Sequence, residues 1–296
     1  GEVEEGAVRL TEVHRFPNGP VRVPTGLHWD VLRLFQEVTV GIQRAWAYGP
    51  LASVGLDTWG VDFALLDRTG ALLENPYHYR DPRTEGMLEE VTRRISRDEL
   101  YRRTGIQFLS INTLVQLTAM AVRRAPALEV ASTFLMVSDL INYWLTGEAV
   151  CEYTNATTTQ CYDATGGTWA EDLLDRLGIP AHIFPRIVPP GTLLGTLHPS
   201  VSEDLGVPDV RVIAPACHDT ASAVAAVPSS HVPFAYISSG TWSLVGTELA
   251  RPLITPEAQA AGFTNEGGAF GTICFLRNVQ GLWLLDESRR RWAQEG

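Results

Sequence analysis

The stretch that decides the fold runs from residue 210 to residue 227 and reads VRVIAPACHDTASAVAAV. Its first six residues are a mostly apolar run that ends at Pro215, which is typical of a buried strand. From Thr220 onward the residues are small and suit a helix. Ligands of α/β proteins gather outside the carboxyl end of a strand and at the N-terminus of the following helix. The stretch therefore predicts the α/β class and places a candidate site between Cys217 and Thr220.

Asp219 and His218 each have two interpretations at this point. The carboxylate of Asp219 can accept a proton from a hydroxyl group that is about to attack. It can equally cap the helix that starts at Thr220. His218 can belong to a site, or it can be a core histidine whose hydrogen bonds are satisfied. The local residues favour neither interpretation.

Two further motifs could carry chemistry. Residues 57–62, DTWGVD, place two carboxylates around Gly60, and a glycine lets a ligand approach the backbone closely. The simpler interpretation, which this motif alone favours, is a turn at a strand end with Trp59 in the core. Residues 238–241, SSGT, offer hydroxyl and backbone N–H groups to a phosphate. Residues 265–271, NEGGAFG, predict a second such loop.

Hydrophobic periodicity and turn residues predict the other elements. The expected helices are residues 28–46, 112–124, 138–146, 168–177 and 281–292. Gly147 and Gly178 stop two of these helices, and Thr168 forms a capping box with Glu171. The expected strands are residues 51–57, 61–67, 234–238 and 241–247, of which the last two form a hairpin. Residues 68–70 predict a hairpin turn, and the proline-rich residues 180–199 predict a surface loop or a crossing between elements.

Composition narrows the function classes. The chain has 296 residues, 45% of them hydrophobic and 19% charged, which favours about two globular domains. The net charge is −11, so no basic surface for nucleic acid is expected, and small molecules or proteins are the expected partners. All 23 basic residues are arginines. A Schiff-base lysine, a Walker A lysine and the ATP-pairing lysine of protein kinases are therefore excluded within this sequence.

The cysteines indicate the compartment. Cys151, Cys161, Cys217 and Cys274 lack C-x-x-C spacing and are too sparse for a disulfide framework, so we expect reduced, buried thiols. The apolar runs are far shorter than the ~20 residues of a membrane span, and no signal peptide opens the sequence. These features predict a cytoplasmic protein without membrane contact.

Eight blocks along the chain occur in a characteristic order. They are residues 55–63 (GLDTWGVDF), 79–84 (YRDPRT), 103–108 (RTGIQF), 152–160 (EYTNATTTQ), 218–224 (HDTASAV), 238–244 (SSGTWSL), 264–269 (TNEGGA) and 281–285 (GLWLL). Together they resemble the FGGY carbohydrate kinase superfamily, and within it the kinases of L-rhamnulose. The resemblance runs from about His14 to Trp292.

The resemblance implies an α/β protein with two ribonuclease-H-like domains of the actin-like ATPase type and an active site in the cleft between them. Residues 1–228 would be the N-terminal, sugar-binding domain, and residues 229–296 would begin the C-terminal, nucleotide-binding domain. The implied reaction is the ATP-dependent phosphorylation of the 1-hydroxyl group of L-rhamnulose, with Mg²⁺ as cofactor. Such a reaction requires an activated hydroxyl, a phosphate-binding loop and a cleft that closes.

The resemblance also implies roles for single residues. By its position in the blocks, Asp219 corresponds to the catalytic base, and it contacts the sugar as well. The other implied sugar contacts are Gly60, His218, Thr220 and Asn278. Thr241 is implied as a contact to the nucleotide phosphates. Asp286 stands where the family usually has a glutamine on the nucleotide side. A contact of Asp286 to the nucleotide is therefore implied by position only, because the side chain differs from the family's. No metal ligand is assigned.

Both ends of the sequence depart from the family pattern. The family begins with a strand and an Asp-x-Gly phosphate loop, and its second domain contains a glycine-rich adenine motif. We therefore expect a fragment whose first domain lacks the initial strand, whose second domain is incomplete, and which shows no kinase activity alone. The alternatives are a non-catalytic sugar-binding or interaction protein, and a kinase of a related ketose such as fuculose or xylulose.

Overall fold

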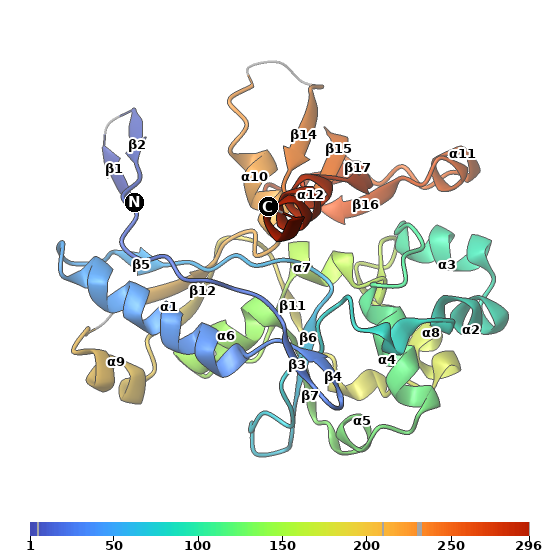
Figure 1. The fold of residues 1–296 in the computed structure, drawn as a ribbon, viewed down its shortest axis with the longest axis horizontal. Helices are drawn as coiled ribbons and strands as arrows, with labels where there is room; N and C mark the ends of the chain where they lie inside the picture. The colour runs from blue at the N-terminus through green and yellow to red at the C-terminus, as the bar shows by residue number, and fades with distance from the viewer. Residues whose placement is uncertain (5, 209, 230–232, 296) are drawn as a thin grey trace.

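The computed structural model describes residues 1–4, 6–208, 210–229 and 233–295, which form a mixed α/β molecule (Figure 1). This confirms the predicted α/β class. Most elements up to residue 218 make a broad body, and the helix at residues 219–225 stands above it in this view together with the C-terminal elements, orange to red. The predicted boundary between residues 228 and 229 lies beside residues 230–232, which are outside the described residues.

The stretch from residue 210 to residue 227 folds as predicted. β13 (Arg211–Ala214) is the middle strand of a three-stranded sheet and α10 (Asp219–Ala225) follows it. β13 is parallel to β5 (Ser53–Val54) and antiparallel to β12 (Thr192–Thr196). Val212 is fully buried there, which is the reason for the apolar run. The strand thus delivers the loop that follows it to the centre of the molecule.

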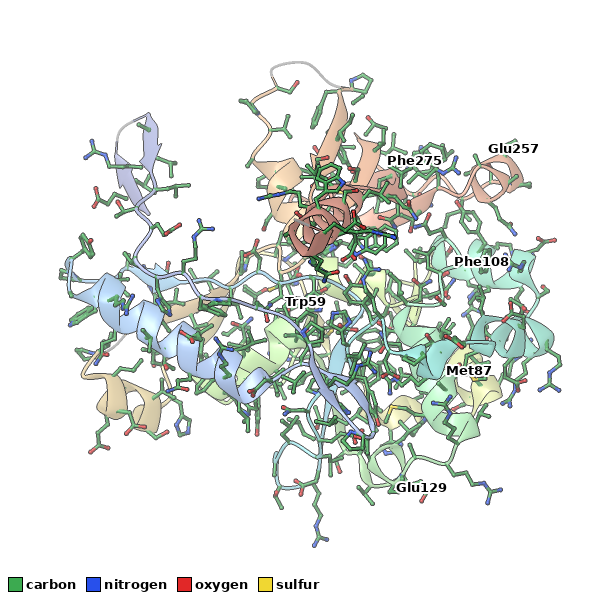
Figure 2. The ribbon with its side chains drawn as sticks, in the orientation of Figure 1. Trp59, Met87, Phe108, Glu129, Glu257 and Phe275 are labelled. Atoms are coloured by element: carbon green, nitrogen blue, oxygen red, sulfur yellow. The ribbon has the colours of Figure 1, made fainter. Side chains whose placement is uncertain are left out.

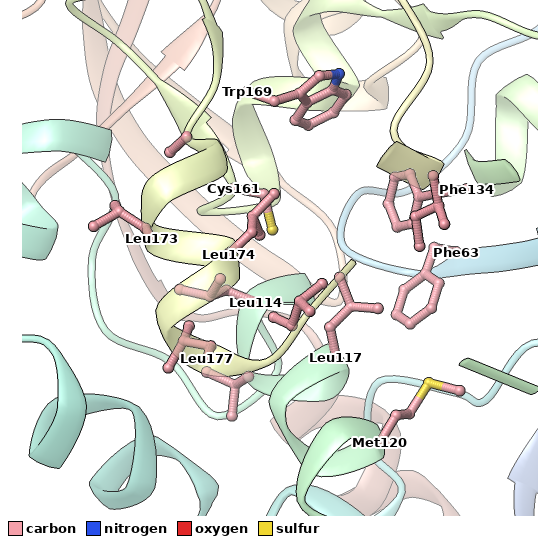
Figure 3. Close-up of a cluster of buried hydrophobic side chains, with 14 of the residues drawn as sticks. Phe63, Leu114, Leu117, Met120, Phe134, Cys161, Trp169, Leu173, Leu174 and Leu177 are labelled. Carbon is pink, nitrogen blue, oxygen red and sulfur yellow. The ribbon is translucent and has the colours of Figure 1, made fainter. Parts of the chain in front are cut away.

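A second strand pair divides the core. β6 (Phe63–Leu66) is antiparallel to β7 (Thr133–Met136), and every residue of β6 is buried. Neighbouring side chains of a strand point to opposite faces, so Phe63 packs into one hydrophobic cluster and Ala64 into another. Figure 3 shows the first cluster, where the strand residues meet leucines of α4 (Thr113–Val122).

Helices enclose the two clusters. The first is surrounded by α2 (Met87–Arg94), α3 (Arg97–Thr104), α4 and α8 (Glu171–Leu177). The second is covered by α1 (Val31–Trp46) and α6 (Val137–Thr146). The predicted stops Gly147 and Gly178 are confirmed, because both have the left-handed conformation, with φ of 86° and 76°.

Several short elements complete the body. They are β1 (Glu2–Glu4), β2 (Ala7–Arg9), β3 (Val21–Val23), β4 (Gly26–His28), η1 (Pro82–Thr84), α5 (Pro126–Val130), β8 (Cys151–Glu152), α7 (Tyr153–Thr158), β9 (Tyr162–Asp163), β10 (Thr168–Trp169), η2 (Ala181–Ile183), β11 (Ile187–Val188) and α9 (Pro199–Leu205). β8 and β11 pair in parallel, which brings distant segments together beside α7.

The structure corrects two local predictions. The Thr168–Glu171 capping box is wrong: Thr168 belongs to β10, and Ala170 is the N-cap of α8 without a side-chain bond. The β9–β10 pairing, which periodicity cannot reveal, takes Thr168 instead. The first predicted helix begins at Val31 rather than at residue 28. Asp30 caps it by accepting the Arg33 N–H at 3.1 Å.

The prediction of a loop over residues 180–199 is also wrong in part. That segment contributes β11 and β12, which pair with strands about 36 and 20 residues away in sequence. The 68–70 turn is confirmed. Gly70 has a φ of 82°, and the flanking Leu66 and Leu72 pair across it.

The C-terminal elements form a four-stranded antiparallel sheet in the order β14-β15-β17-β16. Its elements are β14 (Ala235–Ser239), β15 (Trp242–Leu249), α11 (Pro256–Ala260), β16 (Thr264–Gly267), β17 (Ile273–Gln280) and α12 (Trp283–Glu295). The predicted β14–β15 hairpin and the final helix are confirmed. The predicted loop over residues 265–271 is wrong in its first half, because residues 265–267 belong to β16 and pair with β17.

In the described part of the chain, no helix combines the length and the apolar character that a membrane crossing requires.

Candidate active site

Two adjoining hollows lie between the body and the C-terminal sheet. The smaller hollow has about 620 Å³ of space free of protein atoms, and the larger hollow about 1010 Å³. Six residues line both: Trp59, Gly60, Tyr79, His218, Trp242 and Leu244. Figure 2 shows Trp59 near the centre of the molecule, beneath the C-terminal elements. The smaller hollow is lined by apolar and aromatic side chains with a few polar groups among them, which is typical of a small-molecule site.

The structure gathers most of the predicted site residues here. Besides Gly60 and His218, the larger hollow is lined by Asp219, Thr220 and Thr241, and the smaller by Asn278. Asp286 is exposed in the first turn of α12 and lines neither hollow. The residues come from both sides of the predicted domain boundary.

Asp219 lies at the open edge of this arrangement. It is the first residue of α10, and its side chain is 58% exposed to the larger hollow. His218 is the N-cap, without a side-chain capping bond. Asp219 Oδ1 accepts the Thr220 N–H at 2.6 Å, so the carboxylate also satisfies one donor of the first turn. The interpretation of Asp219 as the helix cap is therefore wrong, because His218 takes the N-cap position and Asp219 is the first residue of the helix.

A buried carboxylate fixes the loop that carries Asp219. Glu152 is fully buried, and its Oε2 accepts the Cys217 N–H at 3.0 Å. The same carboxylate accepts the N–H groups of Thr154 and Asn155 at 3.0 and 3.3 Å. Thr154 Oγ1, which donates to Glu152, in turn accepts the His218 N–H at 3.0 Å. Burial raises the pKa of Glu152, against the lowering effect of these donors.

The motif at residues 57–62 lies directly beside this loop. Thr58 donates its N–H to the Cys217 carbonyl and its own carbonyl accepts the Asp219 N–H, both at 2.9 Å. Thr58 and His218 thus form a parallel bridge. Asp57 is close enough to Asp219 to feel its charge. Desolvation in the cleft raises the pKa of Asp57, and the Asp219 carboxylate raises it further.

The backbone at Gly60 and Val61 is shaped for close approach. A Cβ atom at Gly60 would lie 2.9 Å from Thr158 Oγ1, so only glycine fits. Val61 has a φ of 66°, which is strained for a β-branched residue. Its carbonyl accepts hydrogen bonds from Thr113 Oγ1 at 2.7 Å and Gln116 Nε2 at 3.2 Å. These bonds hold the strained turn at the cavity.

Asp62 is a structural residue, whereas Trp59 of the same motif is only partly buried and lines both hollows instead of lying in the core. It is fully buried, and its Oδ2 accepts hydrogen bonds from Trp29 Nε1 at 2.6 Å, Trp59 Nε1 at 3.0 Å and the Tyr79 N–H at 3.2 Å. Gln116 Nε2 donates to Oδ1 at 3.0 Å. Burial raises the pKa of Asp62 to about 6, although all four donors oppose this shift. Asp62 therefore orients two aromatic side chains that line the cavity.

The C-terminal sheet supplies the opposite wall. The turn at residues 238–241 lines the larger hollow together with Asp219, as a phosphate-binding turn would. The Gly240 N–H donates to the Trp242 carbonyl at 2.7 Å, so hydroxyl groups rather than this N–H face a ligand. On β16, Glu266 Oε2 lies 3.3 Å from His218 Nδ1. Burial raises the pKa of Glu266, whereas His218 lowers it.

Sequence reasoning gave no role to several lining residues. They are Trp59, Tyr79, Gln107, Asn112, Trp242, Thr264 and Glu266. Most of them lie inside the sequence blocks quoted above. The blocks indicated that these residues are near the site but did not indicate what each side chain does there. Their convergence depends on long-range packing, which a local pattern does not contain.

The described residues offer few ligands for a metal ion. Within them, no three His, Cys, Asp or Glu side chains are grouped so that they could hold a metal ion by themselves. A magnesium ion that binds through phosphate oxygens needs only one or two carboxylates from the protein. Asp219, which lines the larger hollow, is a residue of that kind, and Asp57 lies on the neighbouring segment of the same wall without lining either hollow. The donor set therefore fits Mg²⁺ held mainly by a nucleotide.

Comparison with known proteins gives related proteins along the whole chain. The family model for the N-terminal domain of the FGGY family of carbohydrate kinases matches residues 25–226. A rhamnulokinase of Oceanobacillus iheyensis is 46% identical over 297 residues, which cover 100% of this chain and 63% of that protein. A rhamnulokinase of Bacteroides thetaiotaomicron is 45% identical over 99% of this chain and 61% of its own length. The chain thus spans about three fifths of these relatives.

Solved structures share the fold at low sequence identity. A xylulose kinase of Lactobacillus acidophilus matches with a TM-score of 0.76 and 21% identity, over 88% of this chain and 53% of that one. A glycerol kinase of Plasmodium falciparum with ADP matches with a TM-score of 0.77 and 14% identity, over 92% of this chain and 58% of that one. These likenesses support the actin-like fold predicted from the sequence blocks.

Proposed function

Because the chain belongs to the FGGY family of carbohydrate kinases, we propose that the protein containing it is an ATP-dependent kinase of L-rhamnulose that forms L-rhamnulose 1-phosphate. One observation carries this proposal: the exposed Asp219 carboxylate lines the same hollow as Gly60 and His218 and as the hydroxyl-bearing turn at residues 238–241. The rhamnulokinases among the relatives favour this sugar over other ketoses.

We assign the sugar side to residues 1–228 and the start of the nucleotide side to residues 229–296. The sugar contacts in this proposal are Gly60, His218, Asp219, Thr220 and Asn278. Thr241 would contact the nucleotide phosphates. Asp286 would act on the nucleotide side only if the cleft closes further, since it lines neither hollow. The four buried, free cysteines support a reducing compartment such as the cytoplasm.

The chemistry follows from the position of the base. Asp219 accepts the proton of the sugar 1-hydroxyl as the oxygen attacks the terminal phosphoryl group. His218 and the Gly60 turn hold the sugar so that this hydroxyl meets the carboxylate. The aromatic residues Trp59, Tyr79 and Trp242 exclude water from the cavity. When bound, ATP would supply the phosphoryl group and Mg²⁺ would neutralise its charge, and Asp219 is the carboxylate of the larger hollow that could hold the ion together with the phosphates.

The proposal is tested with Asp219→Asn in the full-length protein. The change keeps the shape of the side chain but removes the proton acceptor. We expect kcat for L-rhamnulose to fall ~10²–10⁴-fold, while the Kd for the sugar in calorimetry stays within about threefold. Asp204→Asn, an exposed residue of α9, is the matched control and should leave kcat unchanged. Retention of more than about a tenth of kcat in Asp219→Asn would contradict the role of this carboxylate.

The same assay distinguishes the alternative classes. A wild-type protein that binds L-rhamnulose in calorimetry but transfers no phosphate from ATP would be a sugar-binding protein. A higher kcat/KM for fuculose or xylulose would keep the kinase and change its sugar.

A further inference from the structure

Four buried polar atoms belong to residues that line the smaller hollow and make no hydrogen bond among the described residues. They are Gln107 Nε2, His218 Nδ1, Thr264 Oγ1 and Glu266 Oε2. Their residues are 8%, 6%, 0% and 6% exposed. A buried polar group without a partner costs about 1–3 kcal/mol. His218 Nδ1 and Glu266 Oε2 lie 3.3 Å apart and so compensate each other in part, whereas Gln107 Nε2 and Thr264 Oγ1 have no polar partner in the described part of the chain. Unpaired polar groups beside a cavity indicate that a polar ligand or ordered water completes their hydrogen bonds.

The two strand residues are presented by the pleat of β16. Alternate residues of a strand point to the same face, so Thr264 and Glu266 both face the cavity. Asn265, between them, points away and anchors the strand to the body. Its N–H and its Nδ2 donate to the Gly105 carbonyl at 3.0 and 3.1 Å. The orientation of the two cavity residues is therefore fixed by the anchoring of their neighbour.

Gln107 is held on the opposite side by the body. Its carbonyl accepts Asn112 Nδ2 at 2.8 Å, and the preceding Ile106 carbonyl accepts Gln160 Nε2 at 3.2 Å. These bonds fix the backbone but leave Gln107 Nε2 unpaired. The cavity thus has an amide donor on one side and a carboxylate acceptor on the other. A hydroxyl group can both donate and accept, so this set matches a polyol.

We propose that Gln107, Thr264 and Glu266 form a second sugar subsite, which binds the hydroxyl groups of the ketose remote from the phosphorylated carbon. The inference rests on the proposed function and adds three residues to its site. The Thr264 hydroxyl can serve as donor or acceptor between the other two groups. A ketose that lacks the remote hydroxyls would leave these buried groups unpaired and bind less tightly.

The test pairs isosteric variants with a shortened substrate in the full-length protein. The variants are Gln107→Met, Thr264→Val and Glu266→Gln, and the substrates are L-rhamnulose and dihydroxyacetone, which lacks the remote hydroxyls. We expect each variant to lower kcat/KM for L-rhamnulose ~10–100-fold, mainly through KM, and to change kcat/KM for dihydroxyacetone less than threefold. Gln36→Met, an exposed site on α1, is the control and should change neither value.

The outcomes separate this inference from the proposed function. Equal losses on both substrates would show that the three residues support the fold, and would overturn the subsite. If Glu266→Gln or Thr264→Val does not fold, Gln107→Met decides the question alone. If the wild-type protein transfers no phosphate, the proposed function fails, and calorimetry then tests the subsite. L-rhamnulose should bind the wild type at least tenfold more tightly than Gln107→Met, and equal affinities would overturn the subsite.

Discussion

The two walls of the cavity differ in how they are supported. The wall from the body is backed by two large hydrophobic clusters that meet along β6. The wall from the C-terminal sheet is backed by a small cluster of four buried residues: Val224, Tyr236, Cys274 and Leu276. Within the described residues, α12 has none that is buried. The body wall therefore has a core of its own, whereas the sheet wall depends on contact with the body.

That contact is concentrated at β16. Asn265 bonds to Gly105, and the Gly267 N–H donates to Thr157 Oγ1 at 2.8 Å. Tyr101 contributes another bond through its hydroxyl to the Phe263 carbonyl at 2.9 Å. We therefore expect substitutions in the body wall to lower the stability of the whole fold. Substitutions in the sheet wall should instead weaken the docking of the sheet onto the body. Four predictions test this difference.

The largest effect is expected from Glu152→Ala. The change removes the acceptor for the N–H groups of Cys217, Thr154 and Asn155, which would remain buried without a partner. We expect the free energy of unfolding in urea at pH 7 to fall by about 3–5 kcal/mol. Glu129→Ala, at an exposed position of α5, should change it by less than about 0.5 kcal/mol. If Glu152→Ala lowers the free energy of unfolding by less than about 1 kcal/mol, the body wall does not support the stability of the fold as we infer.

The second effect depends on pH. Burial raises the pKa of Asp139 in the body to about 8 from 3.8. The folded state therefore binds this proton more tightly than the unfolded chain, and the stability that it contributes is lost as the pH rises from about 4 to 8. The variant Asp139→Asn retains the oxygen that accepts the Glu152 N–H. We expect it to reduce the decline of the free energy of unfolding between pH 5 and 7 by up to about 1.4 kcal/mol per pH unit. Parallel slopes for variant and wild type in urea unfolding would contradict the assignment.

The third effect tests the sheet wall. Asn265→Ala removes the bond to the Gly105 carbonyl and the bond from the Leu253 N–H to Asn265 Oδ1 at 2.7 Å. We expect a loss of about 1–2 kcal/mol that is confined to docking. Hydrogen exchange of β16 and β17 amides should accelerate ~5–30-fold, while β6 and β7 amides keep their protection. Asn18→Ala, at an exposed position, is the control. Uniform acceleration in both regions would indicate one cooperative unit instead.

The smallest effect concerns a contact across the cleft. The Arg80 guanidinium lies 5.2 Å from the Tyr79 ring centre and 5.6 and 5.5 Å from those of Trp242 and Trp283 on the sheet side. We expect Arg80→Gln to lower the free energy of unfolding by about 0.5–1 kcal/mol. Arg68→Gln, in an exposed turn, should have no measurable effect. An Arg80→Gln loss equal to that of the control would show that this contact does not help to join the walls.

Local sequence patterns were enough for the elements whose residues are close in the chain. The strand and helix around Asp219, the stops at Gly147 and Gly178, and the β14–β15 hairpin were predicted because turn residues and apolar periodicity act over a few positions. The resemblance also assigned to the site Gly60, His218, Asp219, Thr220, Thr241 and Asn278, all of which line one of the hollows, and Asp286, which lines neither.

Only the tertiary structure decided the supports of the site and the inner face of the cavity. β16 was predicted as a loop because its strand character comes from β17 and from packing against α7. Gln107 and Glu266 had no local signature because they meet at the cavity from about 160 residues apart, and Glu152, although it caps α7 locally, meets the Cys217 N–H 65 residues away. Periodicity reports which face of an element is apolar. The pairing of buried polar atoms depends on which distant segments the core brings together, and that is a property of packing.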